Sequence, residues 1–260
     1  AGEHWFLHFQ DLGAYGRVVH LNPMRWEDDW PVMGQDMDGN GVGEPLEHMG
    51  MPKVAGATAP NAPQTSDEFD GALGLQWQWQ ANPQPGWASL VARPGWLRLH
   101  GGRAPAGDLS DEPRQLLQKL PAPNFMATTL VEFSKSGSAP HEARAGLVVM
   151  GQTYAGLMVS EAAHGPQLTQ ITGGRPGAPQ AGPQPEHVVA LASGLPPKVW
   201  LRVTVEQPAR CTFSYSTDGE RFTVLGEPFT ATPGHWMGAK VGIVCQGDGA
   251  VADFESFTIE

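Results

Sequence analysis

Short runs of alternating apolar and polar residues recur along most of this chain and restrict it to a fold built from β-strands. In residues 73–79, leucine and tryptophan alternate with glycine and glutamine, which gives a strand one apolar face. Similar runs occupy residues 96–100, 128–133, 146–150, 156–159, 188–191, 200–205, 211–216, 221–225, 241–244 and 251–259. The 33 glycines and 24 prolines disfavour long helices and supply many turns. We therefore predict an all-β protein with a β-sandwich of the jelly-roll type.

A few segments depart from this pattern. Residues 114–119 predict a brief helix, and the Gly/Pro-rich residues 173–185 predict a loop. The Asp218-Gly219 pair predicts a hairpin turn, because both residue types tolerate positive φ angles. Cys211 and Cys245 lie in separate strand-like runs, and their spacing leaves a disulfide and two buried thiols equally open.

Charge and composition exclude several functions. A formal net charge of -11 argues against nucleic-acid binding, which needs clustered Lys and Arg, and suits a neutral ligand. No apolar run approaches the roughly 20 residues that a membrane span requires, so we expect no membrane partner. The first residues lack a signal-peptide pattern, and we expect the chain to be a fragment of a longer protein. A periplasmic or extracellular location is slightly favoured.

The N-terminal segment looks like the end of another structure. Residues 4–10 and 17–21 form two strand-like runs, joined by a turn that carries Gly13 and Gly16. Two strands cannot bury a core alone. We therefore predict a remnant of an upstream domain in residues 1–32, a Gly/Pro/Asp-rich linker in residues 33–70 and the sandwich in residues 71–260.

Several separated motifs resemble glycoside hydrolase family 43, whose members are mainly β-xylosidases and α-L-arabinofuranosidases. The segment HWFLHFQDLGAYGRVVHLNPMRW, with WPVMG shortly after it, is similar to the closing part of that family's five-bladed propeller. LGLQWQWQANPQPGWASLVARPGWLRL and FSYSTDGERFTVLG resemble the concanavalin A-like sandwich that follows the propeller. That sandwich has also been classed as a xylan-binding module.

The resemblance implies both a function and a missing part. Family 43 enzymes invert the sugar configuration with an Asp base and a Glu acid, which this mechanism places roughly 6.5–9.5 Å apart. These carboxylates lie on earlier blades, so we expect the chain alone to be inactive. We expect it to support the missing upstream catalytic propeller and to bind xylan or arabinoxylan oligosaccharides. Two alternatives stay open: an autonomous xylan-binding module, and an enzyme with an unrecognised site on the sandwich.

Five residues are candidates for sugar contact. The resemblance implies that Arg17 reaches the sugar pocket, where its five fixed donors suit neighbouring hydroxyl groups; a salt bridge that closes the blade is the alternative. Gln10 and Asp11 flank the same turn. Trp96 shares a strand face with charged side chains and would be a sugar platform if that face is open. Trp87 lies near a turn, where it would stack on a sugar or hold a loop.

Two groups of residues are candidates for a structural Ca²⁺. Residues 36–47 match a twelve-residue calcium loop, although no flanking helix is expected and Pro45 disfavours one. The oxygen ligands would come from Asp36, Asp38, Asn40, Glu44 and Glu47. The resemblance implies a second site where the first and last sandwich strands meet, with Glu68 and Asp253 as ligands. Asp67 or Asp70 could replace Glu68.

Overall fold

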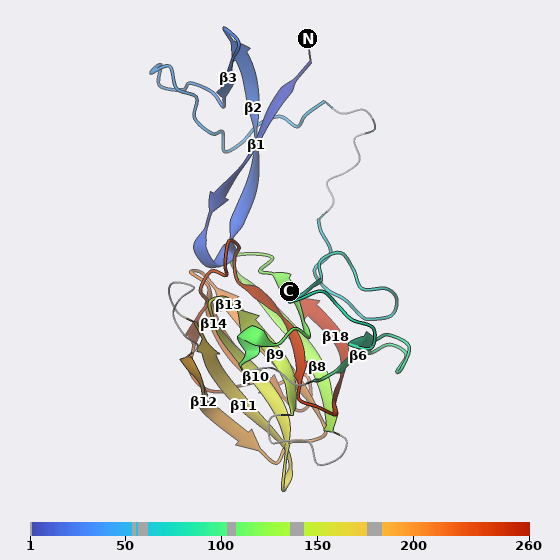
Figure 1. Cartoon of the computed structure of the whole chain (residues 1–260). Helices are drawn as coiled ribbons and strands as arrows, with labels where there is room; N and C mark the ends of the chain where they lie inside the picture. Colours follow the sequence, from blue (N-terminus) through green and yellow to red (C-terminus); the bar gives the residue numbers. More distant parts are fainter. Residues whose placement is uncertain (1, 54–55, 57–61, 103–107, 136–142, 176–183) are drawn as a thin grey trace. The chain divides into compact units, whose positions relative to one another are not determined.

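The chain forms two compact units in a computed structural model that describes residues 2–53, 56, 62–102, 108–135, 143–175 and 184–260 (Figure 1). The smaller unit contains Ala1–Leu12 and Arg17–Ala62, and the larger contains Gly13–Gly16 and Pro63–Glu260. Residues 63–70 thus belong with the larger unit, where Asp67 forms an isolated bridge with Phe257. None of the helices among the described residues is long and apolar enough to cross a bilayer.

The smaller unit is a three-stranded antiparallel sheet in the order β1-β2-β3. Its strands are β1 (His4–Asp11), β2 (Arg17–Glu27) and β3 (Trp30–Met33). Asp28 and Asp29, with φ angles of 47° and 62°, make the tight turn between β2 and β3. Among the described residues of this unit, Asn22 is the only buried one. The sheet therefore has no apolar core of its own.

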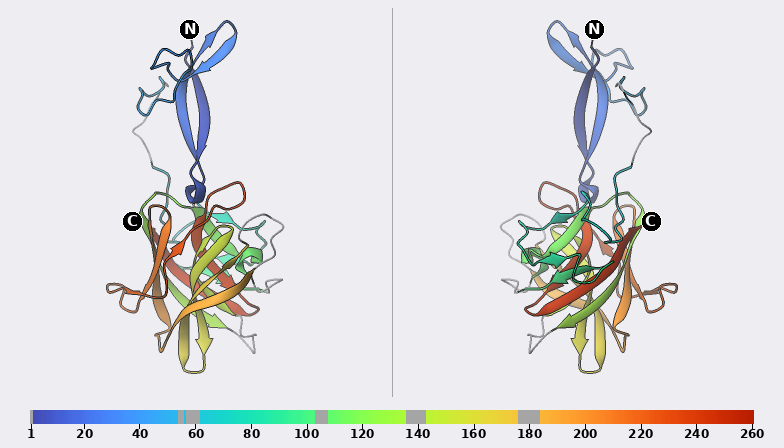
Figure 2. Two further views of the ribbon diagram at one scale, coloured as in Figure 1. Left: turned by 90° about the vertical axis from the view of Figure 1, so that its left-hand side faces the viewer. Right: turned by 90° about the vertical axis from the view of Figure 1, so that its right-hand side faces the viewer.

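The larger unit is a sandwich of two antiparallel sheets (Figure 2). The seven-stranded sheet has the order β12-β11-β10-β9-β17-β7-β4, and the eight-stranded sheet has the order β15-β14-β13-β8-β18-β6-β5 with β16 paired to β14. In chain order the strands are β4 (Gln78–Trp79), β5 (Ala88–Ser89), β6 (Leu97–His100), β7 (Gln115–Lys119), β8 (Phe125–Lys135), β9 (Arg144–Met150), β10 (Thr153–Ala162), β11 (Gly165–Gly174), β12 (Gln184–Ser193), β13 (Lys198–Glu206), β14 (Arg210–Ser216), β15 (Thr223–Val224), β16 (Phe229–Thr230), β17 (Lys240–Gln246) and β18 (Ala250–Ile259). Two 3-10 helices, η1 (Gly13–Tyr15) and η2 (Leu109–Asp111), complete the described elements.

The alternating pattern of the strands fills the space between the sheets. On β13, Val199, Leu201, Val203 and Val205 are fully buried, while the residues between them are partly exposed. They belong to one large apolar cluster with residues of both sheets. A second buried cluster includes residues of β7, β9, β10 and β17 that alternate with those of the first cluster. The seven-stranded sheet is therefore apolar on both faces.

The expected helix at residues 114–119 is wrong, because Gln115–Lys119 is strand β7. This strand pairs with β17 on one side and with β4 on the other. Leu116 belongs to the main cluster and Leu117 to the second, so the segment is buried on both faces. Tertiary pairing therefore overrides the helix preference of Gln, Leu and Lys.

The all-β fold and most of the predicted strands are confirmed. In the runs at residues 73–79 and 221–225 only Gln78–Trp79 and Thr223–Val224 are extended. Four further strands, β3, β5, β11 and β16, were not predicted from the sequence. Part of the loop expected at residues 173–185 lies outside the described residues, and its first two residues end β11. Gly219 has the expected positive φ of 80°. Cys211 and Cys245 are both free and buried.

Candidate carbohydrate-binding and metal sites

The turn end of the β1–β2 hairpin brings together three residues predicted to contact sugar. Asp11 pairs with Arg17 and Gln10 pairs with Val18 in the strand register. The side chains of Gln10, Asp11 and Arg17 are exposed. The Arg17 guanidinium lies 4.8 Å from the centre of the Phe9 ring. This arrangement presents the guanidinium at the surface, and its contact with a sugar stays a prediction.

Trp96 is covered by cationic side chains. Trp96 is only 9% exposed, and the Arg93 guanidinium carbon lies 3.6 Å from the centre of its ring. The Lys198 Nζ atom lies 5.0 Å from the same ring. Gly95, with a φ of 76°, turns the chain so that the Trp96 N–H donates to the Arg93 carbonyl. The ring thus contacts cations where the sequence suggested a sugar platform.

Trp87 is half-buried and packs against two side chains. Its ring meets that of Trp79 edge to face, with centroids 5.6 Å apart, and the Arg114 guanidinium lies 5.3 Å from it. The Trp87 carbonyl accepts a hydrogen bond from the His100 N–H at 2.9 Å. Trp87 therefore fixes the segment before β5 to the end of β6.

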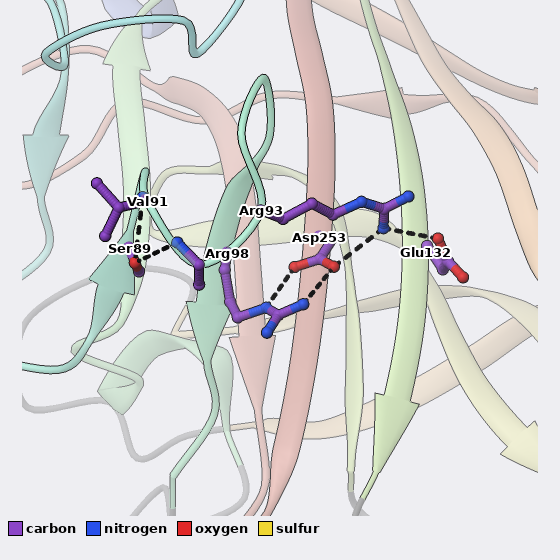
Figure 3. Close-up of polar contacts among 7 residues, drawn as sticks. Ser89, Val91, Arg93, Arg98, Glu132 and Asp253 are labelled. Atoms are coloured by element: carbon purple, nitrogen blue, oxygen red, sulfur yellow. Dashed lines mark hydrogen bonds and ion pairs between the residues drawn. The ribbon is translucent and has the colours of Figure 1, made fainter.

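Asp253 lies at the centre of an ion-pair network on the eight-stranded sheet (Figure 3). Arg98 donates to both of its oxygens, at 2.7 and 2.8 Å, and Arg93 donates to Oδ2 at 3.0 Å. Arg93 also donates to Glu132 at 2.7 Å. Burial by itself raises the pKa of Asp253, but the hydrogen bonds from the two arginines outweigh it and lower the pKa. Because both carboxylate oxygens accept from guanidinium groups, Asp253 does not fit a calcium ligand.

The residues predicted to bind calcium together with Asp253 differ in their exposure and contacts. Glu68 and Asp70 are exposed, and Asp67 is buried. The Asp67 carboxylate accepts hydrogen bonds from the Phe69 N–H at 2.9 Å and from the Trp77 indole N–H at 2.8 Å. Asp67 therefore anchors the first residues of the sandwich to its own neighbours.

The acidic loop after β3 gathers most of its proposed calcium ligands. Carboxylate oxygens of Asp36, Asp38 and Glu44 lie within 4.8 Å of one another, while Glu47 is exposed and is not in this group. Asp36 accepts from the Gly41 N–H at 2.9 Å, and this hydrogen bond is the main reason why its pKa is lowered. The Asn40 side chain accepts from the Val42 N–H. Closely spaced carboxylate oxygens are the ligands that a hard cation such as Ca²⁺ prefers, and in the loop these oxygens also accept hydrogen bonds from backbone N–H groups.

One pocket of the sandwich was not predicted from the sequence. Its volume is about 560 Å³, within the usual range for small-molecule sites. The described residues that line it are Gln80, Ser110, Met150, Gly151, Gln152, Arg175, Gly234, His235, Met237, Gly238 and Lys240. They come from η2, from the last residue of β9, from the first residue of β17, and from the segments that follow β4, β9 and β11 and precede β17. No motif in the sequence joins segments so far apart.

Close backbone packing builds the wall of this pocket. A side chain at Gly151 would lie 2.0 Å from the Thr232 carbonyl oxygen, so only glycine fits there. The next residue, Gln152, donates its N–H to the Pro233 carbonyl at 3.0 Å and accepts from the Arg175 N–H at 2.7 Å. These contacts hold the β9–β10 turn, the loop before β17 and the end of β11 together.

The pocket lining carries positive charge. Arg175 and Lys240 are cationic, His235 can be protonated, and the described lining residues include no carboxylate. Arg175 donates through NH2 to Asp111 at 2.6 Å, while its buried Nε has no hydrogen-bond partner in the described part of the chain. Burial, together with the charge of Lys119, lowers the pKa of Lys240.

Comparison with known proteins agrees with this architecture. The family model described as "Beta xylosidase C-terminal Concanavalin A-like domain" matches residues 66–260. The chain is 36% identical over 242 residues to a Xylanibacter ruminicola protein named "Putative beta-xylosidase". The aligned region covers 93% of this chain and 42% of that relative. It is 29% identical over 267 residues to a Formosa agariphila "Beta-xylosidase", and this alignment covers 94% of the chain and 43% of that protein.

A solved structure gives the same result. The structure described as "Bifunctional GH43-CE Bacteroides eggerthii" matches with a TM-score of 0.80 and 25% identity, over 100% of this chain and 33% of that one. The chain spans less than half the length of the two curated relatives. The match confirms the concanavalin A-like sandwich that the sequence predicted. The chain belongs to the family of β-xylosidase C-terminal concanavalin A-like domains, which are found in glycoside hydrolase family 43 proteins.

Proposed function

We propose that this chain is the accessory portion of a xylan-degrading β-xylosidase or arabinofuranosidase and that it supports an upstream catalytic propeller. The observation that carries the proposal is the three-stranded sheet of the smaller unit, which buries no apolar side chain among its described residues. Leu7, Phe9 and Val19 are 67%, 53% and 61% exposed. Strands with so much exposed apolar surface are stabilised by packing against further strands.

An association experiment tests this proposal. The catalytic propeller of a close relative would be mixed with this chain, and complex formation and hydrolysis of a nitrophenyl xyloside would be measured. We expect the complex to form and Val19→Asp to weaken it strongly, because the charge would lie on the packing surface. Val224→Asp is the matched control, since Val224 is similarly exposed, at 58%, but lies on the sandwich. Equal binding by both variants, or hydrolysis by this chain alone, would contradict the proposal.

A second function, xylan binding by the sandwich itself, is favoured by the pocket. Two glutamines and a serine in its lining offer hydrogen bonds to hydroxyl groups. Retention on insoluble xylan in an affinity gel would support this function. Because Trp96 and Trp87 pack against cations, we expect their replacement to lower stability more than retention.

We also propose that the acidic loop holds a structural Ca²⁺. The support is the group of oxygens from Asp36, Asp38 and Glu44, with Asn40 between them in the sequence. Such an ion would stabilise the loop and take no part in catalysis. Calcium titration by calorimetry, compared with the Asp36→Asn variant, tests the proposal.

A further inference from the structure

The pocket at one end of the sandwich has a chemistry that differs from the rest of the protein. The chain carries a net charge of -11, yet Arg175, Lys240 and His235 line this pocket without a carboxylate among its described lining residues. We infer that the pocket binds a sugar that carries a carboxylate, such as a uronic acid group on a xylan-derived oligosaccharide. This inference goes beyond the proposed support of a propeller and rests on the second proposed function, xylan binding at the same pocket; the xylotriose titration below measures neutral binding separately.

The first argument is the unused hydrogen-bonding capacity of Arg175. Its NH2 group is engaged by Asp111 at 2.6 Å, and its backbone N–H by Gln152. Its Nε–H is buried and has no hydrogen-bond partner among the residues that the structure describes. The Arg175 side chain as a whole is 39% exposed, and a guanidinium has five N–H donors, of which NH2 donates to Asp111, so further donors remain for an acceptor that enters the pocket. A carboxylate is a strong acceptor for a guanidinium group.

The second argument is the position of Lys240. It lies directly opposite Lys119 in the pairing of β17 with β7, and like charges directly opposite each other repel. Lys240 is half-buried, and its lowered pKa reports the unfavourable burial and repulsion. An anion bound beside Lys240 would offset the repulsion from Lys119, because an opposite charge favours the protonated amine.

The third argument is the remainder of the lining, which suits a sugar better than an inorganic anion. Gln80, Gln152 and Ser110 provide both donors and acceptors for hydroxyl groups. Met150 and Met237 provide apolar surface for the C–H face of a sugar ring. The volume of about 560 Å³ is larger than an inorganic anion requires.

Calorimetric titration of the full chain tests this inference with four probes: xylotriose, free glucuronate, a glucuronic acid-substituted xylo-oligosaccharide and inorganic sulfate. We expect the substituted oligosaccharide to bind at least tenfold more tightly than xylotriose. Its affinity should fall severalfold when NaCl rises from about 20 to about 300 mM, because screening weakens the charge contribution. If glucuronate binds as tightly as the oligosaccharide, the pocket recognises the acidic ring alone, which also supports the inference.

Three variants locate the binding site. Lys240→Gln and Arg175→Gln should each weaken binding of the acidic oligosaccharide about tenfold, and Lys240→Arg should restore most of it. The control is Arg221→Gln, which removes the same charge from an exposed side chain outside the pocket lining. Thermal melting would show that each variant is folded.

Several outcomes would overturn the inference. An acidic oligosaccharide that binds no more tightly than the neutral one, or that does not bind at all, would refute it. So would sulfate that binds the chain as tightly as the acidic oligosaccharide, or an effect of Arg221→Gln as large as that of Lys240→Gln. Support of a propeller is measured by association without any sugar, so failure of one proposal is distinguishable from failure of the other.

Discussion

Removal of the Asp253 carboxylate is the most direct test of how the eight-stranded sheet is held together. Asp253 is only 6% exposed and accepts three hydrogen bonds from Arg93 and Arg98 (Figure 3). In the Asp253→Ala variant, Arg98 loses its carboxylate partner, while Arg93 keeps its contact with Glu132. We expect the variant to fold with a lower free energy of unfolding.

The size of the loss follows from the burial of the partners. Breaking a fully buried ion pair costs about 3–5 kcal/mol. The arginine side chains are 28% and 31% exposed, so water can partly replace the lost carboxylate. We therefore expect a loss of about 2–3 kcal/mol, which for a domain of this size lowers the melting temperature by about 4–12 °C.

Urea unfolding of the full chain at two pH values measures this loss and its sign. The pKa of Asp253 is lower in the folded state, so its contribution to stability is present above the unfolded-state pKa and is lost as the pH falls through the folded-state pKa. The variant should therefore differ from the wild type at pH 7 and converge with it in strong acid. Glu132→Gln is the control and should cost less, since Glu132 is 34% exposed. A loss below about 0.5 kcal/mol at pH 7, or one that disappears on adding a calcium chelator, would refute the reasoning.

Three further predictions concern other parts of the chain. Glu112 is fully buried, and burial raises its pKa although Arg114 contacts its Oε1; its Oε2 has no partner among the described residues. Glu112→Gln should therefore raise the urea midpoint at pH 7 but not below the unfolded-state pKa, and a lower midpoint at pH 7 would contradict this. Phe254→Ala removes a fully buried ring from the main cluster and should cost about 3–5 kcal/mol in urea unfolding, whereas Leu75→Ala, at a fully exposed residue, should cost less than about 0.5 kcal/mol. Calcium should protect the acidic loop from proteolysis, and Asp36→Asn should abolish that protection while leaving melting of the sandwich unchanged.

The sequence predicted the fold well because the sandwich strands are strongly patterned. On β13, buried valine and leucine alternate with partly exposed residues, and a two-residue period identifies such a strand without any tertiary information. Strand β7 has no such period, because Leu116 and Leu117 are both buried, on opposite faces of the seven-stranded sheet. A segment that is buried on both faces cannot be distinguished from a short helix by its pattern alone.

The sites were less predictable because their chemistry depends on partners distant in sequence. Trp96 and Asp253 were singled out as a sugar platform and a calcium ligand, yet both contact arginines that only the fold brings near them. Lys240 and Arg175 line one pocket although 64 positions separate them in the chain, and neither lies in a recognisable motif. Within the acidic loop the ligand spacing is local, and three of the five residues named from the sequence, Asp36, Asp38 and Glu44, lie close together, while Glu47 is not in this group.

The loop that precedes β17 links the pocket to the hairpin turn at the start of the chain. Gly238 lines the pocket, and a side chain added to it would lie 2.5 Å from the backbone nitrogen of Gly16. The Ala239 N–H donates to the Ala14 carbonyl at 2.7 Å, and the Tyr15 hydroxyl accepts from the Ala209 N–H at 2.8 Å. The turn Gly13–Gly16 is therefore part of the sandwich unit, although the adjoining strands belong to the other unit. A sandwich produced without this turn would lose the support behind one wall of the pocket, so the ligand binding that we propose should be weaker in such a sandwich.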